Sequence, residues 1–232
     1  MTTDQRVFRL LVDGPMEGAW NMAVDEALLA AAHDPSAAPV LRWYQWAAPT
    51  LSLGYFQRWQ DVPEHLQALP RVRRSTGGGA ILHDDELTYS LAFPSGTWPT
   101  TSGLRIVGEM HDAAAAAIQE FSPQPPLATP SVAGNRGKEP FLCFDRRSVH
   151  DLVAGADKIM GSAQRRQGGR LLQHGSIRLR GLNANAMAER ITRLLAARWN
   201  VRFEPTSLTA LEKRFAEEFA GKHRSPEWTQ RK

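Results

Sequence analysis

Residues 73–84 read RRSTGGGAILHD, and the prediction of the fold starts from this stretch. Three successive glycines, Gly77, Gly78 and Gly79, stand between two strand-like runs, where they let the backbone turn freely and let a ligand approach it closely. Their N–H groups can donate to a carbonyl oxygen or a phosphate. The pattern lacks the Gly-Lys-Ser/Thr of a P-loop and the spaced glycines of a dinucleotide-binding turn. A flexible hairpin turn explains the glycines alone, but the flanking arginine pair and His-Asp favour a binding loop.

Strands and helices surround this loop on both sides. Upstream, alternating apolar residues and turn signals predict strands at 6–12, 40–46, 50–54 and 71–74 and helices at 17–32 and 64–69. Downstream, they predict strands at 80–83, 87–93, 151–164 and 170–179, a loop at 122–140, and helices at 104–121, 184–198 and 207–220. This mixture of hairpins and helices indicates an α+β fold, a mixed β-sheet flanked by helices.

The chain length and the cysteine count limit the kinds of protein that fit. The 232 residues suit a single domain, which we expect to have a core at about 6–180 and a short helical C-terminal cap at about 181–232. The one cysteine, Cys143, can neither form a disulfide within the chain nor belong to a metal site of clustered cysteines, so we expect no metal. It is either an inert buried thiol or a reactive one.

The charge and hydropathy patterns indicate a cytoplasmic protein without a membrane segment. The first nine residues mix acidic and basic side chains and lack the apolar centre of a secretory signal. The longest apolar helical stretch, 113–118, is far too short to cross a bilayer. The formal net charge of +4 suits electrostatic steering of an acidic partner. Nucleic-acid-binding signatures are absent, so we expect no nucleic-acid partner.

Two positions after Cys143 are further candidates for a site. Lys158 stands among apolar residues on a predicted strand and is followed by the small residues Gly161, Ser162 and Ala163. It is either a surface lysine or a buried ammonium at a reacting centre, and the pattern alone does not separate the two. His174 lies in an apolar strand, where a lone histidine is more often structural than functional. The residues alone therefore name candidates without fixing the chemistry.

Short segments in a fixed order carry a resemblance to a known family. They are NMAVDEAL at 21–28, LSLGYFQ at 51–57, RRSTGGGA at 73–80 with His83, LTYS at 87–90, Cys143-Phe144, DKI at 157–159, GSAQRR at 161–166 and HGS at 174–176. With these segments the chain resembles the biotin/lipoate protein ligase superfamily, and within it the lipoate-ligase-like octanoyltransferases that modify the glycine-cleavage H protein. The cysteine at 143 and the short region after 179 favour this branch over the ATP-dependent ligases.

The resemblance implies an enzyme of lipoate biosynthesis, a protein N-octanoyltransferase with the biotin/lipoate protein ligase catalytic fold. It implies transfer of an octanoyl group from acyl carrier protein to Cys143, and then to a lysine of a lipoyl domain in the H protein or in a 2-oxoacid dehydrogenase E2. Cys143 and Lys158 are the expected catalytic residues, and we expect no cofactor because the thioester donor is already activated. The expected substrate-binding residues are Arg73, Ser75, Thr76, Gly77, Gly78, Gly79, His83, Gly161, Ser162, Ala163 and His174.

The implied chemistry requires Cys143 to react as a thiolate, because the thiolate and not the thiol is the nucleophile. A free cysteine has a pKa of about 8.5 and is only a few per cent ionised near pH 7. A nearby cation favours the ionised form, and Lys158 is the candidate for that cation. The same charge would help to stabilise the oxyanion that forms when the carbonyl is attacked. Backbone N–H groups of 77–79 or 161–163 are further candidate donors.

Three other functions stay open at this point. An ATP-dependent lipoate or octanoate ligase would use Lys158 and the glycine loop to hold an acyl-adenylate, and Gly79 matches the ligases where some transferases have arginine. A non-catalytic protein that binds lipoyl domains or acyl groups is the second, because Arg146 and Arg147 stand where the family often has a nearby proline. The third is an amidotransferase that moves octanoate between two proteins.

Overall fold

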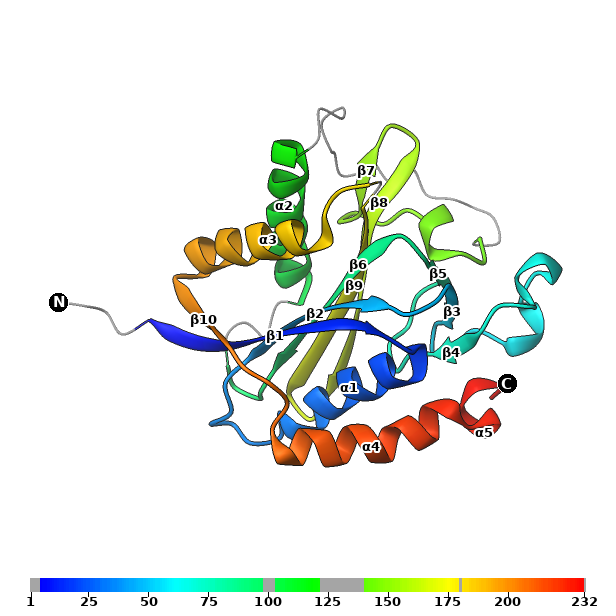
Figure 1. The fold of residues 1–232 in the computed structure, drawn as a ribbon, viewed down its shortest axis with the longest axis horizontal. Helices are drawn as coiled ribbons and strands as arrows, with labels where there is room; N and C mark the ends of the chain where they lie inside the picture. Colours follow the sequence, from blue (N-terminus) through cyan, green and yellow to red (C-terminus); the bar gives the residue numbers. More distant parts are fainter. Residues whose placement is uncertain (1–4, 98–102, 122–139, 180, 232) are drawn as a thin grey trace.

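The chain folds around a seven-stranded mixed sheet, with helices on both faces and a small three-stranded sheet beside it (Figure 1). The structure is a computed structural model, and it describes residues 5–97, 103–121, 140–179 and 181–231. The predicted loop at 122–140 lies, apart from Pro140, outside these described residues. The α+β architecture expected from the sequence is confirmed.

The large sheet combines parallel and antiparallel neighbours. β1 is parallel to the strand on each side of it, and every other neighbouring pair in the sheet is antiparallel. In spatial order the strands are β10 (Val201–Pro205), β1 (Arg6–Met16), β2 (Val40–Trp46), β6 (Glu86–Phe93), β9 (Arg170–Arg178), β8 (Asp157–Gln167) and β7 (Leu152–Ala154).

The small sheet holds both ends of the triple-glycine stretch. It consists of β4 (Arg71–Arg73), β3 (Thr50–Leu53) and β5 (Ile81–His83), in that order. β3 lies between the other two, parallel to β4 and antiparallel to β5. The glycines join β4 to β5, so this stretch passes from one edge of the small sheet to the other and is fixed at both ends.

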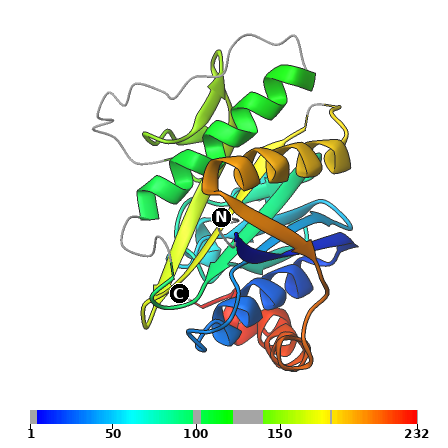
Figure 2. The same cartoon turned by 90° about the vertical axis from the view of Figure 1, so that its left-hand side faces the viewer.

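Two pairs of helices cover the large sheet. Figures 1 and 2 show α2 (Gly103–Phe121) and α3 (Ala184–Trp199) on one face, and α1 (Gly18–Ala31) and α4 (Ala210–Arg224) on the other. The C-terminal helix α5 (Pro226–Thr229) follows α4. Three short 3-10 turns, Trp59–Asp61, Glu64–Leu66 and Cys143–Asp145, complete the elements.

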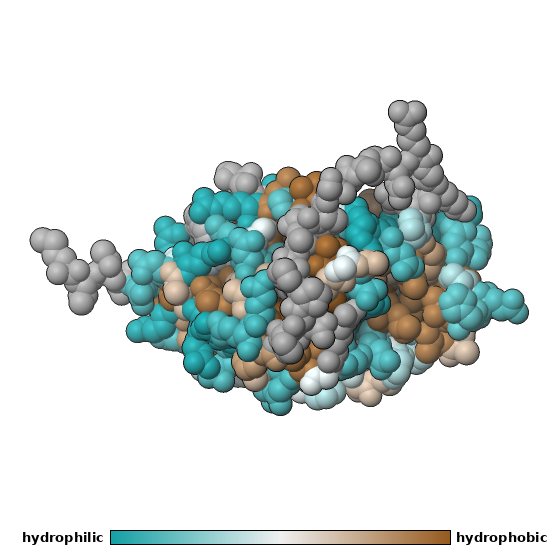
Figure 3. Space-filling model, turned by 90° about the horizontal axis from the view of Figure 1, so that it is seen from above, coloured by the Kyte–Doolittle hydropathy of each residue, from teal (hydrophilic) through white to brown (hydrophobic). Residues whose placement is uncertain are grey.

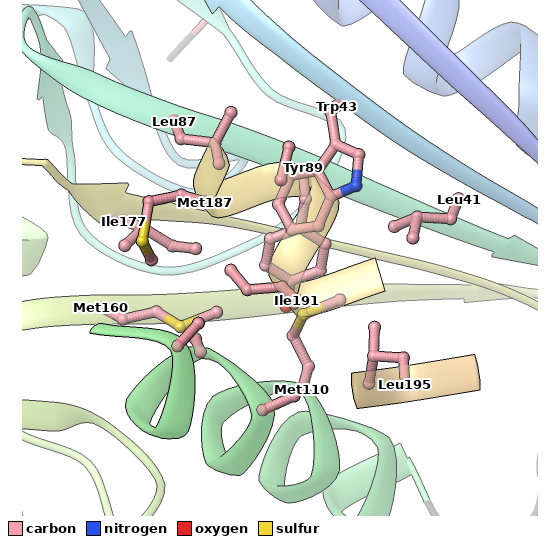
Figure 4. Close-up of a cluster of buried hydrophobic side chains, with 14 of the residues drawn as sticks. Leu41, Trp43, Leu87, Tyr89, Met110, Met160, Ile177, Met187, Ile191 and Leu195 are labelled. Atoms are coloured by element: carbon pink, nitrogen blue, oxygen red, sulfur yellow. The ribbon is translucent and has the colours of Figure 1, made fainter. Parts of the chain in front are cut away.

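The main core lies between the large sheet and the α2–α3 pair. In Figure 4, Trp43 of β2 and Leu87 and Tyr89 of β6 face Met110 of α2 and Ile191 of α3. All five side chains are buried. Alternate residues of a strand point to opposite faces, so every second residue of β6 enters this core.

The intervening residues give the opposite face of the sheet a polar character. In β6 they include Glu86, Thr88 and Ser90, which are all buried. Arg42 of β2 and His174 of β9 stand opposite Ser90 in the strand register and therefore share its face. Buried polar groups need partners, so a concentration of them on one face marks where a site can form.

The C-terminal region is part of the domain and not only a helical cap. The cap predicted at 181–232 does contain α3, α4 and α5, but it also supplies β10, which pairs with β1. A five-residue edge strand has too few alternating positions to stand out in the sequence, because its stability comes from a partner far away in the chain. α4 begins at a capping box, in which Thr209 and Glu212 bind each other's backbone N–H groups.

The predicted strand at 151–164 is divided in two. A turn separates β7 from β8, and Gly155 within it has a φ of 60°, which a glycine adopts without strain. β8 and β9 form a hairpin, with Gly168 and Gly169 at positive φ between them. The short helix predicted at 64–69 is a 3-10 turn at Glu64–Leu66.

The surface carries apolar side chains in separate places. Figure 3 shows apolar areas interrupted by hydrophilic residues on the face seen from above. Exposed apolar residues such as Phe56, which is 75% exposed, and Leu104 are normal when they occur singly. Among the described residues, the helices lack either the length or the apolar character needed to cross a membrane.

Candidate active site

A cavity opens on the polar face of the large sheet, beside the triple-glycine stretch. About 410 Å³ of space between atoms belongs to it, open solvent at its mouth included. The predicted site residues that line it are Gly78, His83, Cys143, Gly161, Ser162, Ala163 and His174. Across the described part of the chain, no three His, Cys, Asp or Glu side chains gather as a metal site would need.

Cys143 and Lys158 come together at this cavity. Cys143 begins a 3-10 turn and is half-buried, whereas Lys158 of β8 is only 4% exposed. The Lys158 Nζ donates to the Cys143 Sγ at 3.6 Å and to the Cys143 carbonyl oxygen at 3.3 Å. The interpretation of Lys158 as a surface lysine is therefore wrong, and the predicted pair of thiol and ammonium exists.

The segment that carries Cys143 is attached to the end of the glycine stretch. The Cys143 N–H donates to the Ala80 carbonyl at 2.6 Å, and the Ala80 N–H donates to the Phe141 carbonyl at 3.0 Å. A Cβ at Gly79 would lie 2.9 Å from the Cys143 nitrogen, closer than folded proteins allow. Gly79 is therefore glycine because the cysteine's backbone passes directly against it.

Lys158 is held by a third partner, Asp151. Its Nζ lies 2.8 Å from the Asp151 Oδ2, and both side chains are buried. The same oxygen accepts the Ser148 N–H at 2.8 Å, which fixes the carboxylate in place. An ammonium has three N–H donors, and the carboxylate, the carbonyl and the sulfur of Cys143 provide three acceptors. Asp151 was not among the predicted site residues.

Arg74 ties the glycine stretch to the small sheet. It donates from Nη2 to the carbonyls of Gly77 and Gly79, at 2.9 and 2.8 Å, and from Nη1 to the Ser52 hydroxyl at 2.9 Å. Burial lowers the pKa of Arg74 to about 10, so it stays charged near neutral pH. Gly78, between the two bound carbonyls, has a φ of 93° and so requires glycine. The arginine fixes the shape of the loop beside Cys143.

His83 is a buried wall residue of the cavity. Its ring stacks on Trp46, with centroids 3.7 Å apart, and its two nitrogens contact Glu86 and the Ser52 hydroxyl. Burial lowers the pKa of His83 and outweighs the opposing charge of Glu86, so the ring is neutral near pH 7. Both ring nitrogens already have partners within the protein. The apolar surface at this wall of the cavity is therefore the stacked pair of His83 and Trp46.

His174 is connected to the helix that carries the NMAVDEAL segment. Its Nδ1 lies 3.0 Å from Asp25 Oδ2, and its Nε2 lies 2.6 Å from the Thr76 hydroxyl. Burial by itself raises the pKa of Asp25, but the His174 hydrogen bond and the charge of Arg42 lower it overall, so the carboxylate is ionised. The predicted residues Thr76 and His174 are thus joined through Asp25 to α1.

The Ser162 side chain belongs to a hydrogen-bond chain on the α2 side of the sheet. Burial lowers the pKa of His111 to about 4, so its ring is neutral and its Nδ1–H donates to the His150 carbonyl. The His111 Nε2 must then accept the Ser162 hydroxyl, 2.7 Å away. Ser162 in turn accepts from Tyr89 at 2.6 Å, because the Tyr89 oxygen accepts the amide of Gln173. The Ser162 hydroxyl proton is therefore committed to His111.

Arg73 lies outside the cavity lining. Within the described part of the chain its guanidinium donates only to backbone carbonyls, and its side chain is fully buried. The acceptors are the carbonyls of Gly54, Tyr55, Gln57, Trp228, Thr229 and Arg231. Arg73 thus joins the turn after β3 to the C-terminal residues, and its predicted contact with substrate remains a prediction that this placement does not support.

Four other predicted residues also lie beside the cavity rather than in its wall: Ser75, Thr76, Gly77 and Gly79. Ser75 is buried, and its carbonyl accepts a hydrogen bond from Arg165 at 3.0 Å. Gly77 faces the ring of Phe56, which would lie 3.8 Å from an added Cβ. They shape the loop next to Gly78, which does reach the cavity.

The cavity lining also includes residues that the sequence analysis did not select. They are Met22, Tyr44, Trp46, Arg74, Ile81, Thr88, Gly175 and Ser176. Met22 belongs to the NMAVDEAL segment, which carried the family resemblance, so that segment was a usable signal. The aromatic residues of β2 gave no signal, because an aromatic residue in a strand is ordinary core material.

Comparisons with known proteins agree with this arrangement. The model of the lipoyl protein ligase A/B catalytic domain matches residues 17–206. The octanoyltransferase LipM of Moorella thermoacetica is 32% identical, covering 97% of this chain and 98% of the relative. That of Kyrpidia tusciae is 35% identical, covering 98% of this chain and 100% of the relative. These full-length relatives are acyltransferases, which confirms the predicted enzyme class.

Solved structures share the fold. Lipoate-protein ligase A bound with ATP is 20% identical with a TM-score of 0.77, covering 96% of this chain and 98% of the other. The structure of a bi-partite lipoate protein ligase and its E2 lipoyl domain from Thermoplasma acidophilum gives 19% identity and a TM-score of 0.76, covering 97% and 96%. At such identities the likeness concerns the fold alone. The chain belongs to the lipoyl protein ligase A/B catalytic-domain family, and the resemblance drawn from its sequence is confirmed.

Proposed function

We propose that this member of the lipoyl protein ligase A/B family is an octanoyltransferase that carries the acyl group on Cys143. The donor is octanoyl-acyl carrier protein, and the acceptor is a lysine of a lipoyl domain, in a glycine-cleavage H protein or a 2-oxoacid dehydrogenase E2. The single observation that carries the proposal is the 3.6 Å contact between the Lys158 Nζ and the Cys143 Sγ at the cavity. The full-length LipM relatives support the choice of reaction.

In the first half-reaction the Cys143 thiolate attacks the carbonyl carbon of the donor thioester. The new C–S bond forms to Cys143, the C–S bond to the carrier breaks, and the carrier leaves as a thiol after taking up a proton. The buried Lys158 ammonium stabilises negative charge first on the sulfur and then on the oxyanion. Asp151 supports this by holding the ammonium at the cysteine.

In the second half-reaction the neutral amine of the acceptor lysine attacks the Cys143 thioester. An amide forms, the C–S bond to Cys143 breaks, and the sulfur leaves as a thiolate beside Lys158 while the amine gives up a proton. Conversion of a thioester to an amide is favourable, so the reaction needs no ATP. The cysteine is restored to the state in which it began.

The acyl chain would occupy the cavity next to Gly78, where the missing side chain leaves room. The apolar surfaces available to it are Met22, Ile81 and the stacked pair of Trp46 and His83. Contacts of this kind favour an alkyl chain through burial and provide few hydrogen-bonding groups for a polar ligand. This lining supports an alkyl chain as the occupant.

The test is intact mass spectrometry after the protein is mixed with octanoyl-acyl carrier protein. The expected result is a gain of one octanoyl group, which hydroxylamine removes because it is a thioester. Cys143→Ser should gain no such label while keeping the circular dichroism spectrum of the native protein. Full transfer by Cys143→Ser would sink the assignment of the nucleophile.

The same samples separate the alternatives. Pyrophosphate release with free lipoate or octanoate and ATP would identify an ATP-dependent ligase, for which Cys143 is incidental. Binding to a lipoyl domain without transfer from any donor would identify a non-catalytic protein. Acyl uptake from an octanoylated lipoyl domain, and none from the carrier protein, would identify an amidotransferase.

A further inference from the structure

Gly161 occupies a position in β8 where the backbone itself does not call for glycine. Its φ is not among the positive values, unlike those of Gly78 and Gly155. Glycine in the interior of a strand lacks a side chain to pack and weakens the strand, so it often marks a close approach by another group. The reason for this glycine has to be sought in the space around it.

The Lys158 side chain fills that space. A Cβ added at Gly161 would lie 2.5 Å from the Lys158 Cε and 2.7 Å from its Nζ, and 3.5 Å from the Asp151 Oδ1. Ordinary contacts between carbon atoms are about 3.5–4.0 Å, so the lysine would have to move. Its Nζ is held at the Cys143 sulfur and at Asp151, so any such movement takes the ammonium away from them.

We infer that Gly161 is a positioning residue, whose missing side chain leaves the path along which Lys158 reaches Cys143. The inference rests on the proposed function, because it concerns the pairing that activates the cysteine. Gly161 also lines the cavity, so the competing explanation is that it only leaves room for the acyl group. The two explanations differ in what happens to the cysteine when no acyl group is present.

Gly175 provides a matched control on the neighbouring strand. It also lines the cavity, and it stands opposite Ser162 in the β8–β9 register. A Cβ there would meet the Gly161 carbonyl oxygen and the Ser162 hydroxyl, both at 2.5 Å, and the Tyr89 ring at 2.8 Å. Lys158 is not among these neighbours, so an alanine at 175 disturbs the sheet without pushing directly on the lysine.

The experiment measures alkylation of the protein by iodoacetamide at pH 7, without donor or acceptor. The chain has one cysteine, so the rate reports Cys143 alone. We expect Gly161→Ala to slow alkylation about tenfold, to the rate of Lys158→Ala, because an unassisted cysteine is mostly protonated at this pH. The double variant Lys158→Ala/Gly161→Ala should react no more slowly than Lys158→Ala. An unchanged rate of alkylation for Gly161→Ala would overturn the inference.

Thermal unfolding of the same variants keeps the test decisive if Gly161→Ala folds poorly. Gly161→Ala should lower the melting midpoint in the native background and leave it unchanged in the Lys158→Ala background, where the obstructing side chain is gone. Gly175→Ala should lower the midpoint equally in both backgrounds. A similar loss for Gly161→Ala in both backgrounds would show that Lys158 is not the reason for the glycine. Neither measurement uses an acyl donor, so failure of the proposed octanoyl transfer would be seen separately.

Discussion

Two regions of this molecule each bury a cation, and they use it in opposite ways. In the thiol pocket, formed by Cys143, Lys158 and Asp151, the ammonium divides its donors between a carboxylate and the cysteine. The C-terminal clamp consists of Arg73 with the carbonyls of 54–57 and 228–231, and of Glu26 with Lys222 and His223. In it the Arg73 guanidinium donates to backbone oxygens. The Lys158 ammonium thus contacts a thiol at the cavity, whereas the Arg73 guanidinium joins two segments that lie far apart in the chain.

The clamp has a second member, Glu26, which attaches α4 to α1. Its carboxylate accepts Lys222 Nζ at 2.6 Å and His223 Nε2 at 2.9 Å. Near the chain end, the Trp228 Nε1 donates to the Arg73 carbonyl at 3.1 Å, so the two anchors of the clamp act on one continuous C-terminal segment. If the comparison is right, changes in the clamp alter stability, and changes in the thiol pocket alter reactivity.

The largest effect on stability should come from Arg73→Ala. It leaves the buried carbonyls of Gly54 and Thr229 without this donor, and each such loss costs about 1–3 kcal/mol, so we expect the free energy of unfolding to fall by roughly 2–6 kcal/mol. Urea denaturation measures it. Arg58→Ala is the control, because its ion pair with Asp61 is exposed and should be worth no more than about 0.5 kcal/mol. If Arg73→Ala is as stable as the native protein but no longer binds the octanoyl group, Arg73 contacts the substrate and is not a structural residue of the clamp.

Glu26→Gln should have an intermediate effect that depends on pH. Burial by itself raises the pKa of Glu26, but the hydrogen bond from His223 and the pairing with Lys222 outweigh it and lower the pKa from 4.5 to about 2. The charged carboxylate therefore stabilises the fold above pH 4.5, and this contribution is lost as the pH falls towards 2. We expect Glu26→Gln to lose about 2 kcal/mol at pH 7 and almost nothing near pH 2.

Urea denaturation at a series of pH values checks this prediction. The stability of the native protein should approach that of Glu26→Gln between pH 4.5 and 2. A difference that stays constant down to pH 2 would mean that the shape of the side chain, and not its charge, holds α4 to α1.

The smallest effect should come from Ser162→Ala, at the border of the thiol pocket. Its hydroxyl proton is committed to His111, so we expect octanoyl transfer to change by no more than about threefold and the free energy of unfolding to fall by about 1 kcal/mol. Steady-state kinetics and urea denaturation measure the two. A loss of transfer by a hundredfold, with normal stability, would place the hydroxyl at the acyl carbonyl and break the comparison.

Much of the fold was accessible from the sequence because local patterns are strong there. The apolar periodicity of α2 and the alternation along β6 predicted both elements at nearly their observed positions. β10 was not predicted, because its partner strand β1 lies far away in the chain. The turn at Gly155 that separates β7 from β8 was not predicted either, because a glycine within an apolar run also fits a continuous strand.

The candidate site divides in the same way. Cys143, Lys158 and the glycine stretch could be selected because the order of several short segments matched a family. Asp151 lies outside the matching segments, and only its distance to the Lys158 Nζ shows that it holds this ammonium. Arg73 and Arg74 are neighbours of identical type in one motif, yet one enters the C-terminal clamp and the other lines the cavity.

By itself the sequence determined the family and the α+β architecture, and it made Cys143 and Lys158 candidates for the site, because these depend on residue types and on their order. The tertiary structure alone decided which polar groups are already satisfied within the protein. Each buried donor contacts the acceptors within hydrogen-bonding distance, and those distances arise only when segments far apart in the chain pack together. That is why the Lys158 Nζ reaches the Cys143 sulfur, whereas the Arg73 guanidinium donates to the carbonyls of the clamp.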